Sequence, residues 1–173
     1  SNYAGAQWSI AMGASARTYT ISQRSYAGLV NTVSGFSQEE EYIVGVNTSA
    51  GAGAASVELT ADKLPAGGAN RIFIQNDSYY SFWGIVNGSG RDTLGGTVYN
   101  YCAEIKGVVR RINATTVAFL GCPTVTVLGD DSSAKLSFDL QLDTANNALQ
   151  LIGQNTAAVY QAGWTAYVKM LKN

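Results

Sequence analysis

The chain has 173 residues, which suits one domain of ordinary size, and 46% of them are hydrophobic, which is enough for a substantial core. Only 13% are charged and the net charge is −1, so no basic surface for nucleic acid or an anionic membrane is expected. The chain contains no histidine, which excludes Ser-His-Asp and Cys-His catalysis and the usual zinc sites. No apolar run approaches the roughly 20 residues of a membrane-spanning helix, so membrane insertion is not expected.

The first 28 residues are rich in small side chains. Residues 9–16 read Ser-Ile-Ala-Met-Gly-Ala-Ser-Ala, and Ser-Tyr-Ala-Gly at 25–28 echoes them. This S-x-A-x-G-x-x-A pattern resembles the head repeats of trimeric adhesins and the shafts of phage fibres. In those proteins short strands from three chains stack into a β-roll, so the resemblance implies an arm that joins a trimeric β-roll. The alternative is an ordinary Ala/Gly-rich arm.

A polar segment follows the arm. Ser34 and Gly35 predict a turn, and the three glutamates at 39–41 predict a solvated loop or the rim of a subunit contact rather than a metal site. Residues 42–46 predict a short strand, and the Ala/Gly run at 49–55 predicts a flexible connection. The expected division is an N-terminal arm over residues 1–45 and a C-terminal β-sandwich domain over residues 46–173.

From residue 56 onward, short strand-like runs alternate with turns. A glycine-rich hairpin loop is expected at 88–96, and no segment has a helical period. Many short strands, with turns about every 8–12 residues, predict a β-sandwich or barrel. The strands are expected at 56–60, 71–75, 79–86, 97–112 and 115–120.

The last third has the clearest pattern. From residue 136 to 143 apolar and polar residues alternate strictly, which predicts a strand with one buried and one wet face. Residues 130–133 and 144–147 predict turns, and further strands are expected at 148–153 and 163–171. The chain is therefore expected to end in an antiparallel meander. The whole is predicted to be all-β, an antiparallel, jelly-roll-like β-sandwich preceded by the Ala/Gly-rich arm.

This region also carries a resemblance. A strand at 107–111 leads to Phe-Leu-Gly-Cys-Pro-Thr-Val-Thr-Val at 119–127, then to Asp130 and Asp131, a D-T-x-N-x-A-L run at 143–149 and a final strand with Trp164. The series, from about residue 70 to the end, resembles the C-terminal domain of tailed-bacteriophage tail fibres and related prophage structural proteins.

The resemblance implies a virion protein without enzymatic activity. It would be the distal C-terminal domain of a trimeric tail fibre or spike, acting in trimer assembly and in attachment to a bacterial cell-surface receptor, with a glycan as one candidate receptor. It would be assembled in the bacterial cytoplasm and act outside the cell as part of the phage tail.

No catalytic or metal-binding constellation is expected. Asp139 and Asp143 are about 13 Å apart along one strand face, beyond the separation that glycosidases use. Asp130 and Asp131 predict a solvated turn, because they lack the Asp-x-Asp-x-Asp-Gly spacing of a calcium loop. The 88–96 loop lacks the Gly-Lys-Ser/Thr ending of a phosphate-binding loop. We expect no catalytic residue, no metal and no cofactor.

Aromatic residues crowd the strands beside the 88–96 loop. Alternation places Tyr80 and Phe82 on one face of their strand, and Tyr79 and Trp83 on the other. One set would pack inside while the other meets a subunit or a ligand. For single aromatic residues, core or subunit packing is the favoured interpretation, above all for Trp83 and Trp164.

Three residues are the candidates for receptor contact. They are Arg91 and Asp92 in the glycine-rich loop, and Tyr79. The two cysteines, Cys102 and Cys122, are interpreted as small buried hydrophobic residues, with a disulfide as the alternative.

Three other functions stay open. The same strands and aromatic residues would suit a free-standing carbohydrate-binding or bacterial adhesin module. A capsid decoration protein is a related virion alternative. An enzyme, either a glycan depolymerase or a self-cleaving fibre chaperone, has no pair of acids at suitable spacing and no nucleophile with a base to support it.

Overall fold

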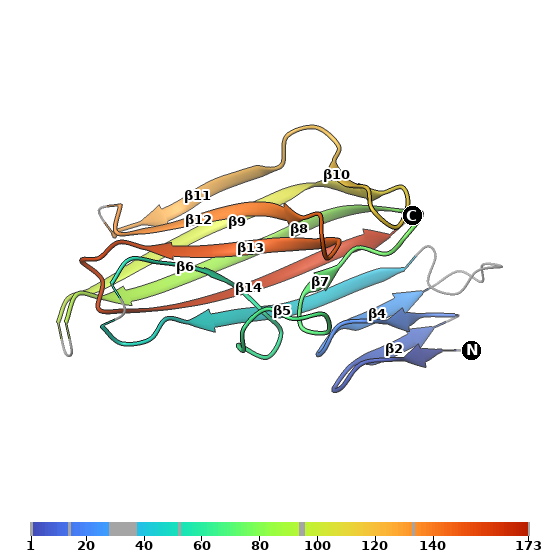
Figure 1. Cartoon of the computed structure of the whole chain (residues 1–173), viewed down its shortest axis with the longest axis horizontal. Coiled ribbons are helices and arrows are strands. Elements are labelled where there is room, and N and C mark those ends of the chain that lie inside the picture. The colour runs from blue at the N-terminus through green and yellow to red at the C-terminus, as the bar shows by residue number, and fades with distance from the viewer. Residues whose placement is uncertain are drawn as a thin grey trace.

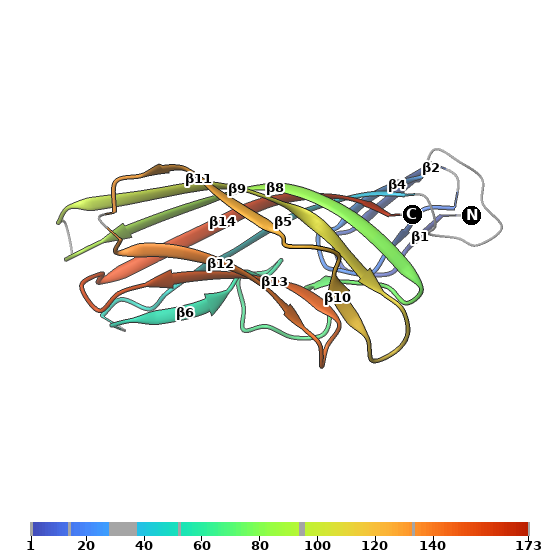
Figure 2. The same cartoon turned by 90° about the horizontal axis from the view of Figure 1, so that it is seen from above.

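The computed structural model describes residues 2–13, 15–27, 38–51, 53–93, 96–132 and 134–172. Within these ranges the regular structure is entirely β-strand, so the predicted all-β sandwich is confirmed. Two sheets pack face to face, the larger above the smaller in Figure 2. No helix in the described ranges is long and apolar enough to cross a membrane. The turn predicted at Ser34 and Gly35 lies outside them.

Eight strands form the large sheet and four form the small one (Figure 1). The large sheet has the order β10 (Val117–Phe119), β9 (Val98–Arg111), β8 (Ser78–Arg91), β14 (Gln161–Lys172), β5 (Glu39–Asn47), β4 (Arg24–Ala27) and β2 (Ile10–Gly13), and β11 (Thr124–Asp130) also pairs with β9. The small sheet has the order β12 (Leu136–Asp143), β13 (Ala148–Asn155) and β6 (Ala55–Glu58), and β7 (Ile72–Phe73) also pairs with β13. A separate parallel pair joins β1 (Tyr3–Ala4) to β3 (Arg17–Thr18).

The core between the sheets is centred on Trp164, which is 1% exposed, so its predicted core position is confirmed. Its ring meets Tyr101 at 5.6 Å and Phe138 at 6.3 Å between centroids. Two glycines make room for it. A Cβ added at Gly88 or at Gly153 would lie 2.5 Å from a ring atom of Trp164, closer than side-chain atoms can approach. One glycine belongs to each sheet, so the indole fills the space between them.

These core contacts correct the predicted 88–96 loop. Strand β8 continues to Arg91, which pairs with Val98. Gly88 lies against Trp164, and a Cβ at Gly90 would come within 3.0 Å of Val159. The first glycines of the run are therefore strand residues that relieve crowding in the core, and the hairpin loop begins only at Asp92.

The predicted C-terminal meander is correct only in its first half. Strands β12 and β13 pair along their full length, and Phe138 and Leu140 point into the core as the alternation predicted. Strand β14 then crosses to the other sheet and lies between β5 and β8. Its alternate residues, Trp164 among them, are buried, which suits the centre of the large sheet.

The N-terminal residues form a parallel β-roll of two rungs. Tyr3 pairs with Arg17 and Ile10 with Arg24, an offset of 14 residues in both pairs of strands. Trp8 and Ser22, also 14 residues apart, both have a positive φ, of 55° and 58°, so the chain turns alike in each rung. We name residues 2–13 and 15–27 the N-terminal roll.

The roll continues the large sheet. Strand β4 pairs with β5, and the roll lies at the end of the sandwich where the C-terminus also lies (Figure 1). The predicted boundary at residue 45 falls within β5, whose Tyr42 and Val44 belong to the core of the sandwich.

Both cysteines are free, and no disulfide joins them. Cys102 is partly buried on β9, whereas Cys122 is exposed next to Gly121. The predicted burial is therefore wrong for Cys122, because the turn between β10 and β11 carries it into solvent.

Candidate functional site

The outer face of the large sheet carries a raised aromatic cluster. It consists of Trp83 and Ile85 on β8 and Tyr167 on β14, and we name it the aromatic ridge. Trp83 is 42% exposed, so the prediction that it packs in the core is wrong. It follows Phe82 on β8 and therefore points to the opposite side of the sheet.

Neighbouring contacts hold the ridge in place. The rings of Trp83 and Tyr167 meet edge to face, with centroids 6.3 Å apart. The indole Nε1 of Trp83 donates a hydrogen bond to Glu104 at 2.6 Å, and the hydroxyl of Tyr167 donates one to Glu41 at 2.9 Å. Desolvation, together with the bond to Glu41, raises the pKa of Tyr167, so this hydroxyl stays protonated. The ridge is thus preorganised.

A polar hollow lies beside the ridge, one step further along the same strands. The side chains there are small and polar, and they leave a depression of about 560 Å³. A second depression of about 410 Å³ shares Ser89 and Gly163 with it. We name the combined hollow the polar trough; its main lining residues are Asn47, Asn87, Ser89, Arg91, Asn100, Gln161, Gly163 and Thr165.

The polar groups of the trough are available to a ligand. Asn87, Ser89 and Thr165 are exposed, and their side chains form no hydrogen bond with any residue in the described part of the chain. Asn100 is engaged instead, because its Nδ2 donates to Asp131 at 3.3 Å. The trough therefore offers free amide and hydroxyl groups on a rigid sheet.

The three residues predicted for receptor contact do not form one site. Tyr79, 50% exposed, and Arg91 lie at opposite ends of β8, about 40 Å apart at the rise of a strand. Arg91 lines one end of the polar trough. Asp92 accepts a hydrogen bond from the hydroxyl of Tyr99 at 3.1 Å. The pKa of Asp92 is lowered, because desolvation, which would raise it, is outweighed by this bond and by backbone hydrogen bonds. Receptor contact by each residue stays a prediction.

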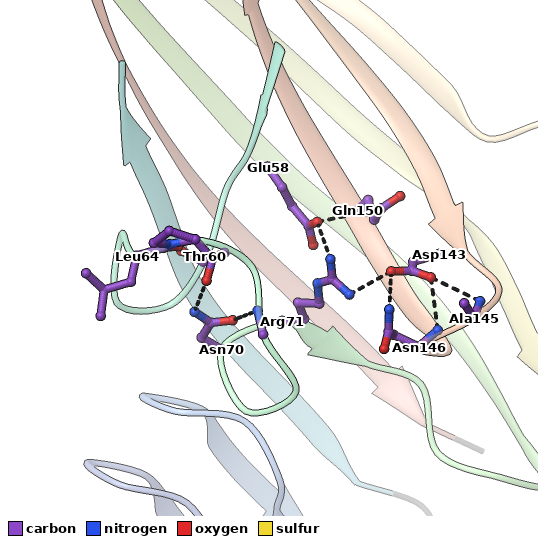
Figure 3. A network of polar contacts seen from close by, with 11 residues as sticks. Glu58, Thr60, Leu64, Asn70, Arg71, Asp143, Ala145, Asn146 and Gln150 are labelled. Atoms are coloured by element: carbon purple, nitrogen blue, oxygen red, sulfur yellow. Dashed lines mark hydrogen bonds and ion pairs between the residues drawn. The ribbon is translucent and has the colours of Figure 1, made fainter. Parts of the chain in front are cut away.

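A second polar cluster crosses the outer face of the small sheet. Figure 3 shows Arg71 between Glu58 and Asp143, with Nη2 and Nη1 at 3.1 and 2.6 Å from the two carboxylates. Gln150 also donates to Glu58, at 2.8 Å, and Asn146 donates to Asp143. The bonds from Asn146 are the main reason that the pKa of Asp143 is lowered. The cluster joins β6 to the β12–β13 turn.

Replacing Arg71 with methionine should lower the free energy of unfolding by about 2 kcal/mol, because two largely buried carboxylates would lose their shared partner. It should also raise the pKa of Asp143. Urea denaturation at neutral pH measures the first effect. The matched control is Lys63→Met, since Lys63 is exposed and forms no printed ion pair with the described residues. Equal stability of the two variants would show that the Arg71 cluster contributes nothing.

The three glutamates at 39–41 are not a solvated loop, contrary to the prediction, because they begin strand β5. Glu40 is fully buried, and it accepts hydrogen bonds from Gln38 and Tyr42. Glu39 and Glu41 point outward, where Glu39 forms an ion pair with Lys169 at 2.9 Å. Strand alternation thus sends the middle carboxylate inward.

Glu40 belongs to a buried polar cluster at the junction with the N-terminal roll. Lys172, 2% exposed, donates a hydrogen bond to Gln75 and is close enough to influence Glu40 electrostatically. Gln38 bonds the backbone of Arg17 at 3.0 Å through both its oxygen and its nitrogen. Desolvation raises the pKa of Glu40 and lowers that of Lys172 to about 8.

Asp130 and Asp131 also serve local structure. Asp130 accepts a hydrogen bond from the backbone of Ser132 at 2.8 Å, and Asp131 accepts one from Asn100. Within the described residues, no group of three or more acidic or cysteine side chains is placed to hold a metal ion.

Comparison with known proteins gives no family. No family model matches the chain, and no curated protein matches it. Among solved structures, the chain is similar to the tailspike protein of Acinetobacter phage vB_ApiP_P1, with a TM-score of 0.36 and 10% sequence identity over 85% of this chain and 24% of that one. The chain thus spans about a quarter of the tailspike. The similarity is compatible with a phage tail protein, but at this level it carries no argument about function.

Proposed function

We propose that the chain is a non-enzymatic structural module of a phage tail fibre or spike. It trimerises through the N-terminal roll and attaches the virion to a receptor on the bacterial surface. The ordered C-terminal series from about residue 70 and the S-x-A-x-G-x-x-A pattern of the arm support this proposal, because each resembles a segment of such fibres. The proposal locates the protein in the phage tail, after assembly in the bacterial cytoplasm.

The observation that carries the proposal is the reversed polarity of the N-terminal roll. Its buried side chains are small or polar, and Gln23 is 0% exposed, with its oxygen accepting from the backbone of Tyr19 and Thr20 at 2.6 and 3.0 Å. Its large apolar side chains point outward instead. Tyr3, Trp8, Ile10, Met12 and Tyr26 are all 45–72% exposed. Exposed apolar groups on a thin roll favour burial against copies of the same chain.

Light scattering on a sizing column tests the proposal. We expect a mass of about 55 kDa, three times the 18.2 kDa of the chain. The triple variant Trp8→Asn, Ile10→Thr and Met12→Gln should lower the mass to that of the monomer while the β-sheet circular dichroism is retained. Asparagine suits the positive φ at position 8.

The matched control replaces two apolar residues that are equally exposed but lie outside the roll, Leu64→Ser and Ile112→Ser. This control should keep the trimer mass. A wild-type monomer would contradict the proposal and favour the alternative, a free-standing carbohydrate-binding or adhesin module. A truncation should remove the roll alone, because removing residues 1–45 would also delete most of β5.

A further inference from the structure

We infer that the polar trough and the aromatic ridge together form a binding site for an uncharged oligosaccharide. This inference rests on the proposed function in receptor attachment and names the chemistry of the receptor. The site lies on the outer face of the large sheet, which is the upper side in Figure 2. It is centred on β8 and β14, the middle strands of that sheet.

The aromatic ridge suits the apolar faces of sugar rings. A pyranose presents C–H groups on its faces and hydroxyls at its edge, so it stacks on an aromatic side chain that is exposed and fixed. Trp83 and Tyr167 meet this requirement, because each ring is held by a hydrogen bond to a carboxylate and by the other ring. A fixed ring loses little conformational entropy when a ligand binds.

The polar trough suits the hydroxyl edge of the same ligand. Tyr167 and Thr165 are two residues apart on one strand face, so the ridge and the trough are about 7 Å from each other. Asn87, Ser89 and Thr165 provide amide and hydroxyl groups, which both donate and accept hydrogen bonds, as sugar hydroxyls do. Because ridge and trough follow the strands, they suit several linked sugars rather than one.

The charges near the trough favour a neutral ligand. Asp130 and Asp131 line the first depression, and Arg91 lines the far end of the second. Two carboxylates against one guanidinium would repel a glycan that carries carboxylates of its own. We therefore expect neutral hexose and N-acetylhexosamine chains to bind better than uronate chains.

Binding is tested by NMR and tryptophan fluorescence on the full chain. The probes are short neutral oligosaccharides of hexose and of N-acetylhexosamine, with a uronate oligosaccharide for comparison, each at millimolar concentration. Trp83→Leu keeps an apolar side chain but removes the ring, and it should weaken binding about tenfold. Gly129→Phe should block the trough, because a Cβ at Gly129 meets no atom within 4 Å. The matched control is Tyr79→Ala, since Tyr79 is comparably exposed on β8 but far from the trough, and it should bind as the wild type does.

The results separate this inference from the proposed function. A trimer that binds no member of the panel would overturn the inference and leave the trimeric fibre module standing. Unchanged affinity in Trp83→Leu would also overturn it, because an apolar contact would then suffice. Loss of the trimer mass in Trp83→Leu would assign this face to subunit contact and overturn it as well. A monomer that binds the neutral probes would support the inference and contradict trimerisation.

Discussion

Replacing Trp164 with alanine should lower the free energy of unfolding by about 3–5 kcal/mol, the usual cost of removing a large buried aromatic side chain. The indole fills the space between the two sheets and contacts both Tyr101 and Phe138. Its loss would leave a cavity that the rigid strands cannot close. Urea denaturation followed by circular dichroism measures the change.

The glycines beside Trp164 give the complementary test. Gly153→Ala should cost about 1–3 kcal/mol, because its Cβ would lie 2.5 Å from the indole ring. Gly129→Ala is the matched control and should change stability little, since open space surrounds that position. In a Trp164→Leu background the cost of Gly153→Ala should shrink, because the smaller side chain leaves room. Additive costs would show that the two positions do not share one space.

Replacing Glu40 with leucine should cost about 3–5 kcal/mol, because the buried donors of Gln38 and Tyr42 would lose their acceptor and Lys172 its neighbouring carboxylate. Glu40→Gln should cost less, since it keeps one acceptor oxygen at the same place. Chemical denaturation of the two variants at neutral pH compares them. An equal loss of stability in both would mean that the acidic group itself, rather than its oxygen, is what matters.

The pH dependence of stability follows from the same cluster. The pKa of Glu40 is raised above its ordinary value of 4.5, so the folded chain binds the extra proton more tightly than the unfolded chain. This contribution is complete below pH 4.5 and is lost as the pH rises through the raised pKa. For Lys172, whose pKa is lowered from 10.5 to about 8, stability should rise with pH between these two values. Glu40→Gln should remove the acidic limb of this profile and leave the alkaline one.

Much of the fold could be predicted from local patterns. Strict alternation identified β12 with its bounds, and it placed Tyr80 and Phe82 inside and Tyr79 outside. Alternation is a local property of a strand, so it survives without knowledge of the partner strands. It does not say which sheet a strand joins. The crossing of β14 to the large sheet was therefore missed.

The errors came from residues whose neighbours are far away in sequence. Gly88 was assigned to a loop because glycine is common in turns, whereas here it makes room for Trp164, which is distant along the chain. Glu40 was assigned to solvent because charged residues are rarely buried, and its hydrogen-bond partners became visible only in the folded chain. The polar trough was also missed, since its residues come from strands β5, β8, β9 and β14 and none is unusual alone.

The regular spacing of the N-terminal roll gives the molecule a unit of length. Each rung uses 14 residues and occupies one strand spacing, about 4.8 Å. Because the rungs are parallel and in register, inserting or removing a whole rung would alter the reach of a fibre without disturbing the sandwich. An insertion of any other length would shift every corner and face out of step. The roll can thus act as an adjustable spacer, whose length evolves independently of the surface it presents.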